Sequence, residues 1–169
     1  ERAERPFKIV AMHHPPVSFG QHAQDWYRDE GRVRAATLRR RLLDLFRRHR
    51  VALVLSGHEH LYEHDVVTLR RPDEEGSHVL HVVVSSGGGA PLGPEADEAS
   101  ITERMLAYEG EGLEAQSLVQ KSVHHFNKVT VTADTLVVTT YTLRRDDPGF
   151  VDVLDRFAVA APEQPPGPE

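Results

Sequence analysis

The sequence lacks several features that would assign it to a particular class of protein. It contains no cysteine, which excludes a disulfide framework and any zinc site built on thiolates. No apolar run approaches the ~20 residues that a membrane-spanning helix needs, so we expect no contact with a membrane. A basic excess is also lacking, because 20 Lys and Arg residues stand against 26 Asp and Glu residues and the formal net charge is −6. We therefore expect no nucleic acid partner.

The N-terminal residues lack both an initiator methionine and the apolar segment of a signal peptide. Core-like Ile9, Val10 and Ala11 follow almost at once, and we interpret the chain as a piece of a longer protein. Its 169 residues, 39% hydrophobic and 27% charged, suffice for one globular domain with a core. We assign residues 1–160 to that domain and expect residues 161–169, rich in proline, to form a disordered tail.

The first part of the chain has the pattern of a strand, a helix and a second strand. Residues 7–12 and 51–55 are short apolar runs rich in branched side chains, and each predicts a buried strand. Residues 33–50 carry apolar side chains at helical spacing, with arginines on the other face. We interpret these arginines as a solvated helix face rather than as a phosphate-binding patch. The order predicts an α/β fold that begins with a βαβ unit and a parallel pair of strands.

The second part of the chain is dominated by strand patterns, mostly antiparallel. Residues 101–108 are expected to form a short helix, and turn signals occur at residues 73–76 and 133–134. Residues 17–31, which include Trp26 and Tyr27, are expected to form a loop. The expected strands cover residues 62–70, 79–85, 125–132, 135–143 and 157–160.

Histidines follow the two strands of the βαβ unit. His13 and His14 come directly after the first strand, and His58 and His60 directly after the second. The carboxyl ends of parallel neighbours lie at one sheet edge, so these imidazoles, which are common metal ligands, should meet there. We expect Gly57 to provide the sharp turn that lets His58 and His60 point into one cavity. The pattern alone leaves two interpretations open, a metal site and a chance clustering among eleven histidines.

Two sequence blocks resemble a known enzyme family. Met12-His13-His14-Pro15-Pro16 and Ser56-Gly57-His58-Glu59-His60-Leu61-Tyr62-Glu63-His64 are similar to the last two signature blocks of the calcineurin-like metallophosphoesterase superfamily, in its purple acid phosphatase-like branch. The segment from Ser77 to Gly89 is similar to the strand and glycine turn that follow in that branch. The resemblance covers residues 7–90. It implies the C-terminal half of a four-layer α/β/β/α sandwich that hydrolyses phosphate mono- or diesters with two metal ions, either Fe, Zn or Mn.

The resemblance also implies a role for individual histidines. His13 and His58 match ligands of the second metal ion, and His60 matches a ligand of the first. His22, nine residues after His13, matches an outer histidine that contacts phosphate or protonates the leaving group; a solvated loop residue is the equal alternative. His14 occupies the variable position of its motif and is expected to shape the site. We interpret His64 as structural.

Three earlier blocks of the family do not occur in this sequence: Asp-x-His, Gly-Asp-x-x-Asp and Gly-Asn-His followed by an acid. The bridging carboxylate is therefore expected from a missing N-terminal half of the same domain. We expect the isolated chain to be inactive, and the activity on a phosphate ester substrate to belong to the complete protein, whose relatives are often exported. We also expect the missing half to leave an apolar sheet face exposed. Two alternatives are a non-catalytic interaction module with the same fold and a protein that binds a single metal ion.

Overall fold

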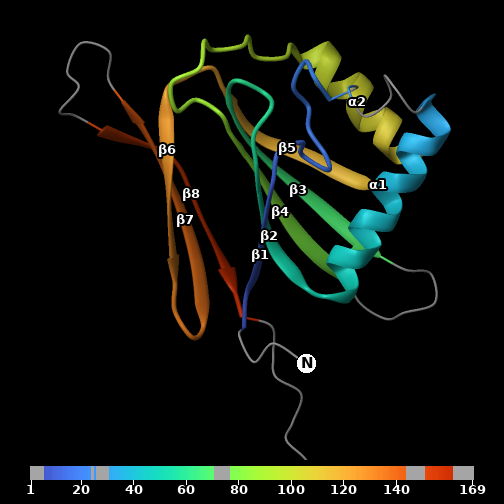
Figure 1. Ribbon diagram of the computed structural model, residues 1–169, viewed down its shortest axis with the longest axis horizontal. Coiled ribbons are helices and arrows are strands. Elements are labelled where there is room, and N and C mark those ends of the chain that lie inside the picture. Colours follow the sequence, from blue (N-terminus) through green and yellow to red (C-terminus); the bar gives the residue numbers. More distant parts are fainter. Residues whose placement is uncertain (1–5, 24, 26–30, 71–76, 144–150, 162–169) are drawn as a thin grey trace, which may run out of the picture.

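The structure is a computed structural model that describes residues 6–23, 25, 31–70, 77–143 and 151–161. Those residues form a mixed α/β fold with two sheets and two helices, which confirms the expected fold class. Three layers follow one another in Figure 1: the helices, a five-stranded main sheet and a three-stranded small sheet. The fourth layer of the expected sandwich, helices over the small sheet, is not present within this described part.

The main sheet contains the βαβ unit near one edge. Its strand order is β1-β2-β4-β3-β5, where β1, β2 and β4 are parallel and β3 is antiparallel to both of its neighbours. Helix α1 connects β1 to β2, as predicted, so both strands end at the same edge of the sheet. The bounds are β1 Lys8–Met12, α1 Gly31–Arg48, β2 Val51–Ser56, β3 Tyr62–Arg70, β4 Ser77–Ser85 and β5 Glu114–Lys121.

The small sheet is formed by the last three strands in the order β6-β7-β8, all antiparallel. The predicted turn at residues 133–134 connects the first two, and the side chain of Thr132 accepts hydrogen bonds from the amides of Asp134 and Thr135 there. The strand bounds are β6 His125–Val131, β7 Thr135–Leu143 and β8 Val151–Ala160.

Both faces of the main sheet are covered. On one face α1 and α2 (Glu98–Gly110) pack over an apolar cluster that includes Leu43, Val54 and Tyr108. On the other face the small sheet packs over a second cluster, which includes Leu53, Val83 and Leu136. Neither helix is long and apolar enough to cross a membrane, within the residues that the structure describes.

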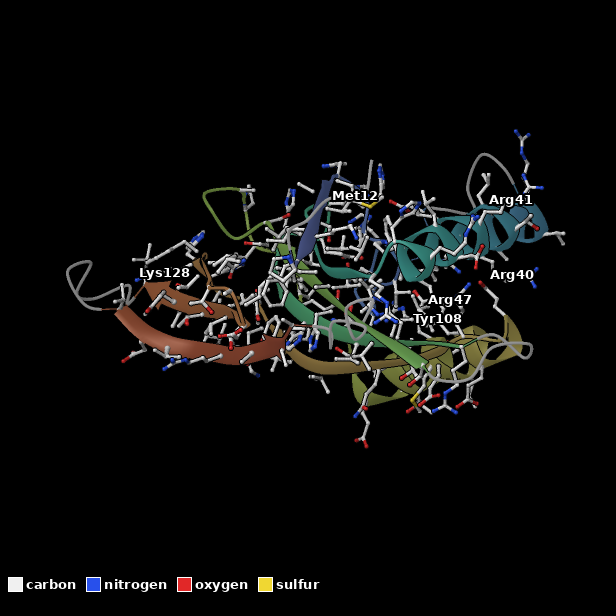
Figure 2. The ribbon with its side chains drawn as sticks, turned by 90° about the horizontal axis from the view of Figure 1, so that it is seen from below. Met12, Arg40, Arg41, Arg47, Tyr108 and Lys128 are labelled. Atoms are coloured by element: carbon white, nitrogen blue, oxygen red, sulfur yellow. The ribbon has the colours of Figure 1, made fainter. Side chains whose placement is uncertain are left out.

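The arginine face of α1 differs in part from the prediction. Arg40, Arg41 and Arg48 are exposed as expected, and the first two are labelled on the helix in Figure 2. Arg39, however, is fully buried, with its Nη1 donating to Glu111 Oε2 over 2.7 Å and its guanidinium 5.1 Å from the ring centre of Tyr108. It turns towards α2 because a long cation can enter the interface between two helices when a carboxylate and an aromatic ring receive it.

Candidate metal centre

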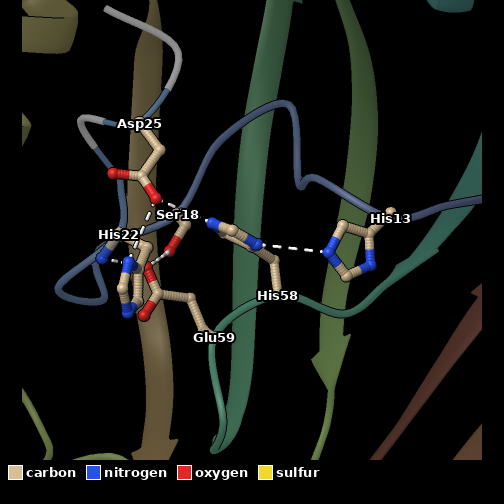
Figure 3. Close-up of polar contacts among 6 residues, drawn as sticks. All are labelled: His13, Ser18, His22, Asp25, His58 and Glu59. Carbon is tan, nitrogen blue, oxygen red and sulfur yellow. Dashed lines mark hydrogen bonds and ion pairs between the residues drawn. The ribbon is translucent and has the colours of Figure 1, made fainter. Parts of the chain in front are cut away.

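The ends of the two parallel strands place the first pair of histidines side by side. Met12 of β1 is opposite Ser56 of β2, and the amide of Gly57 donates to the carbonyl of His13 over 3.0 Å. The two segments that follow the strands are therefore joined by a backbone hydrogen bond. His13 and His58 leave that junction on the same side and face one another in Figure 3.

The sharp turn lies at His58 rather than at Gly57. His58 has a φ of 75°, in the left-handed region that non-glycine residues rarely occupy and that is found at functional sites. The expectation that Gly57 provides the turn is thus wrong. A Cβ at Gly57 would lie 3.0 Å from Ser86 Oγ, a tight contact that a shift of a few tenths of an ångström by the serine side chain would relieve.

Three imidazoles form a group that can hold a metal ion. His13, His14 and His58 each offer a ring nitrogen, and these atoms lie within 4.8 Å of one another. His13 Nε2 and His58 Nδ1 are 3.2 Å apart. Two nitrogen ligands at ~2.0–2.1 Å from one tetrahedral ion would lie about 3.3 Å apart, so this pair fits a shared ion. His14 therefore has the geometry of a candidate ligand, although the sequence assigned it only a supporting place.

A carboxylate that the sequence analysis missed lies beside this group. Asp25 Oδ2 is 2.8 Å from His58 Nε2 and 3.0 Å from His22 Nδ1. An ionised carboxylate only accepts, so Nε2 of His58 carries the proton and Nδ1 is left with a lone pair that faces His13. Metal-binding histidines usually donate their other N–H in this way. His22, Asp25 and His58 also form a second group whose atoms lie within 4.8 Å.

The structure places the remaining candidate residues as follows. The ring of His22 lies 5.1 Å from that of His58, and 46% of its side chain is exposed. His60 belongs to neither group; its Nδ1 donates to the carbonyl of Pro91 over 3.0 Å, which leaves Nε2 with a lone pair. His64 is buried between the sheets, as its structural interpretation requires. Trp26, Tyr27, the turn signal at residues 73–76 and the tail at 162–169 lie outside the described residues.

The environment of the centre favours neutral imidazole at His14. Partial burial lowers the pKa of His14, and the nearby rings of His58 and His13 lower it further when they are charged, while Asp25 opposes them. A neutral ring has the lone pair that a metal ion needs. Desolvation also raises the pKa of the buried Glu59 carboxyl, which follows His58 in the chain.

The described residues fit one ion better than two. The ring nitrogens of His13, His14 and His58 lie close enough together to bind one ion, and imidazole is a suitable ligand for Zn, Fe and related ions. Two cations at short spacing need a shared anionic ligand. Asp25 is the one carboxylate found in either group of possible ligands within the described part, and both groups contain the same His58.

Two packed sheets, with helices over the larger one, form a mixed α/β fold that other solved structures share. Solved structures with this fold include PPD1, a purple acid phosphatase from yellow lupin (Lupinus luteus) seeds, with a TM-score of 0.55 and 19% identity. They also include GAP50, the anchor in the inner membrane complex of Plasmodium, with a TM-score of 0.57 and 16% identity. At these identities the similarity establishes the fold alone.

Coverage is unequal in both comparisons. The lupin phosphatase match covers 95% of this chain and 26% of the other, and the GAP50 match covers 94% of this chain and 38% of the other. The chain thus spans well under half of either similar structure. No protein-family model matches the sequence, and no curated protein matches it either.

Proposed function

We propose that this chain binds a transition-metal ion at His13 and His58 and contributes these ligands to a phosphoesterase site in the complete protein. The observation that carries the proposal is the 3.2 Å approach of His13 Nε2 to His58 Nδ1 at the carboxyl ends of two parallel strands. The similarity of the fold to a purple acid phosphatase supports phosphate mono- or diesters as the substrate class.

The residues around the ion would have distinct tasks. A bound ion supplies Lewis-acid catalysis for phosphoryl transfer. Asp25 holds the proton of His58 at Nε2 and so keeps Nδ1 available as a ligand. His22, half exposed and hydrogen-bonded to the same carboxylate, is the group that can contact phosphate or give a proton to the leaving oxygen.

A second ion requires ligands beyond those that converge here. His60 offers one nitrogen outside both groups, and a bridging carboxylate would have to come from another part of the protein. We propose that the N-terminal half of the same domain supplies it and that Fe, Zn or Mn fills the two positions. The chain alone would then bind one ion and be inactive.

The non-catalytic alternative also has a specific observation behind it. GAP50, whose structure is similar to this chain, is described as an anchor. An interaction module with this fold would need neither the His13–His58 pair nor the Asp25 hydrogen bond. We therefore rank it second, together with a protein that binds one ion without hydrolysis.

Metal binding is tested by titrating the chain with Zn²⁺ or Mn²⁺ in a calorimeter. We expect one site per chain and a loss of affinity of at least about tenfold in His13→Ala and in His58→Ala. His49→Ala, at the exposed end of α1, is the control and should bind as the unchanged chain does. Equal affinity in all four proteins would contradict the proposed site.

Hydrolysis is tested with p-nitrophenyl phosphate and bis(p-nitrophenyl) phosphate. We expect no turnover by the chain alone and metal-dependent turnover by the full-length protein, which His58→Ala abolishes. If the full-length protein binds metal but hydrolyses neither ester, the catalytic proposal fails and the metal-binding alternative stands. If it binds no metal, the interaction module is favoured.

A further inference from the structure

The backbone turn that carries His22 is held by two buried carboxylates. This turn, residues 18–22, follows the His13 segment and lies against the residues between β2 and β3. Glu63 Oε1 accepts from the amide of Phe19 over 2.6 Å, and Glu63 Oε2 accepts from Ser18 Oγ over 2.8 Å. Glu59 Oε1 accepts from the amide of His22, also over 2.6 Å.

Glu59 stands between the two candidate ligands His58 and His60 in the chain, yet its side chain points into the protein and is only 2% exposed. The carboxylate fits because residue 20 is glycine. A Cβ at Gly20 would lie 2.3 Å from Glu59 Cδ, far inside contact distance. The turn and the carboxylate therefore have matching shapes, and Figure 3 shows the Glu59 carboxylate beside His22.

The two ends of the turn are held by different groups. Its beginning is fixed from several sides, because Tyr108 Oη donates to the carbonyl of Ser18 over 2.7 Å and Arg104 donates to the carbonyl of Phe19 over 2.6 Å. The His22 amide has a single proton, and that proton is donated to Glu59. Loss of the Glu59 carboxylate should thus release the end of the turn that bears His22 while its beginning stays in place.

The His22 backbone makes two hydrogen bonds: its amide donates to Glu59 over 2.6 Å, and its carbonyl accepts from the Asp25 amide over 2.9 Å. The His22 ring is half exposed, and its hydrogen bond to Asp25 and ring contact with His58 can form only if the backbone brings it there. Burying a carboxylate is costly unless it receives hydrogen bonds, and the Glu59 carboxylate receives one from the His22 amide. Ser18 Oγ lies farther away, at 3.4 Å, and donates its single proton to Glu63 over the shorter distance of 2.8 Å.

We propose that Glu59 is a positioning residue that holds His22 against His58. Because Glu59 directly follows His58, one short segment supplies both a metal ligand and the anchor for the candidate proton donor. The catalytic meaning of this arrangement rests on the proposed function. The placement of His22 by Glu59 does not, and it can be measured in metal-free protein without substrate.

The test is NMR of the whole metal-free chain in four variants: Glu59→Ala, Glu59→Asp, Glu59→Gln and Gly20→Ala. Two signals are followed, the exchange rate of the His22 amide and the nuclear Overhauser effect between the rings of His22 and His58. In Glu59→Ala, Glu59→Asp and Gly20→Ala we expect His22 amide protection to fall at least about tenfold and the ring signal to disappear. Glu59→Gln keeps an acceptor at the same reach and should retain both.

The Phe19 amide, bound to Glu63, is the internal control and should keep its protection in all four variants. The proposal is overturned if the His22 signals persist without a carboxylate or amide at position 59. It is also overturned if Phe19 loses protection together with His22, because Glu59 would then stabilise the whole turn. Glu59→Asp and Gly20→Ala decide the question if Glu59→Ala does not fold.

A Zn²⁺ titration of the same variants separates this proposal from the proposed function. We expect Zn²⁺ affinity within about threefold of the unchanged chain, since the ligands themselves are intact. A loss of more than tenfold in Glu59→Asp would overturn the positioning role. Absence of Zn²⁺ binding in the unchanged chain would refute the proposed function and leave the His22 result valid.

Discussion

At the residue scale the candidate centre depends on which ring nitrogen of His58 carries its proton. Asp25 accepts from Nε2, so Nδ1 faces His13 with a lone pair. The left-handed backbone of His58 directs the ring into that position. A carboxylate held behind a histidine ligand fixes its tautomer and orientation and raises its basicity.

We predict that Asp25→Asn lowers the affinity for Zn²⁺ by about 10–100-fold, the usual cost of removing such a carboxylate. Asparagine has almost the same shape as aspartate, but it can present its NH₂ group to Nε2 of His58. A proton on Nε2 is then no longer favoured, and Nδ1 is no longer kept free to bind the ion. Calorimetric titration measures the change. Asp134→Asn, in the exposed turn between β6 and β7, should leave the affinity unchanged. Equal affinities in the two variants would show that Asp25 does not orient the ligand.

The sequence predicted part of this centre and not the rest. His13 and His58 were expected to meet because parallel neighbouring strands end at one sheet edge, and that relation follows from hydrophobic periodicity. Asp25 lies in an irregular loop, where no periodicity relates sequence distance to distance in space. The sequence analysis assigned the sharp turn to Gly57, whereas His58 adopts the positive φ. A glycine next to a turn does not show which residue of the turn has the left-handed conformation.

At the scale of elements, a buried ion pair joins the two helices. Arg39 of α1 reaches Glu111, just after α2, and its guanidinium lies near the ring of Tyr108. Figure 2 shows Tyr108 in the interior between these helices. Arg39 lies one helical turn from both Ala35 and Leu43, on the buried face of α1. The sequence analysis missed this contact because it placed all the arginines on the solvated face, where arginine is usually found.

Glu111→Gln should lower the free energy of unfolding by about 3 kcal/mol, because it leaves the buried charge of Arg39 without its carboxylate. The double variant Arg39→Met, Glu111→Gln should recover most of that loss, since neither charge is then buried. Urea unfolding measures both. Glu114→Gln, which breaks the exposed pair with Arg70, is the matched control and should cost less than about 1 kcal/mol. Equal losses in the two single variants would contradict a special role for the buried pair.

A second contact between elements joins the two sheets and should respond to pH. The rings of His64 and His81 in the main sheet stack on Phe157 of β8, and His64 Nδ1 lies 2.8 Å from Asp155 of the same strand. Burial and, to a smaller extent, the neighbouring His64 lower the pKa of His81 to about 4, while the Asp155 carboxylate opposes them. An unfolded histidine binds its proton near pH 6.5, so between about pH 4 and 6.5 the unfolded chain takes up more protons.

The stability that His81 contributes is therefore present above about pH 6.5 and lost as the pH falls towards 4. We predict that the loss of unfolding free energy between about pH 7 and 4.5 is about 1–2 kcal/mol smaller in His81→Gln, after allowance for partial exposure. Urea unfolding at both pH values gives the difference. The variant must be compared with the unchanged chain at each pH, because Glu63 changes the stability of both proteins. Burial raises the pKa of the Glu63 carboxyl, so its contribution to the unfolding free energy increases as the pH falls, opposite to that of His81. His49→Gln should lose as much unfolding free energy between the two pH values as the unchanged chain does. If His81→Gln also loses the same amount as the unchanged chain, the prediction is refuted.

The strand that the sequence missed and the strand that it shortened most both lie at sheet edges. Residues 114–121 form the edge strand β5 although they are mostly polar. Polar side chains fit there because only the face that carries Ala115 is buried. Strand β8 begins at Val151, six residues before the predicted start at Phe157. The prediction missed residues 151–156 because apolar and charged side chains are mixed there. Edge strands are held by backbone pairing to a neighbour, which a single sequence does not reveal.

At the scale of the whole molecule, the small sheet has an outer face that the described residues leave uncovered. Phe126, Tyr141 and Val153 lie in one row across its three strands, and Leu143 and Val151 form a second row beside it. Phe126 and Val153 are about half exposed, as are Leu143 and Val151. The sandwich predicted from the sequence would cover this face with a further layer. Contiguous apolar surface of this kind favours association in water.

We predict that the isolated chain associates through this face as its concentration rises. Phe126→Ser combined with Val153→Ser should abolish or strongly reduce the rise, because the two substitutions remove the central apolar side chains of the first row and leave the backbone pairing intact. Sedimentation velocity over a range of concentrations measures the effect. Leu106→Ser, equally exposed on α2, is the control and should associate as the unchanged chain does. If the double variant and the unchanged chain sediment alike, association, where present, uses another surface, such as the edge of the main sheet at β1.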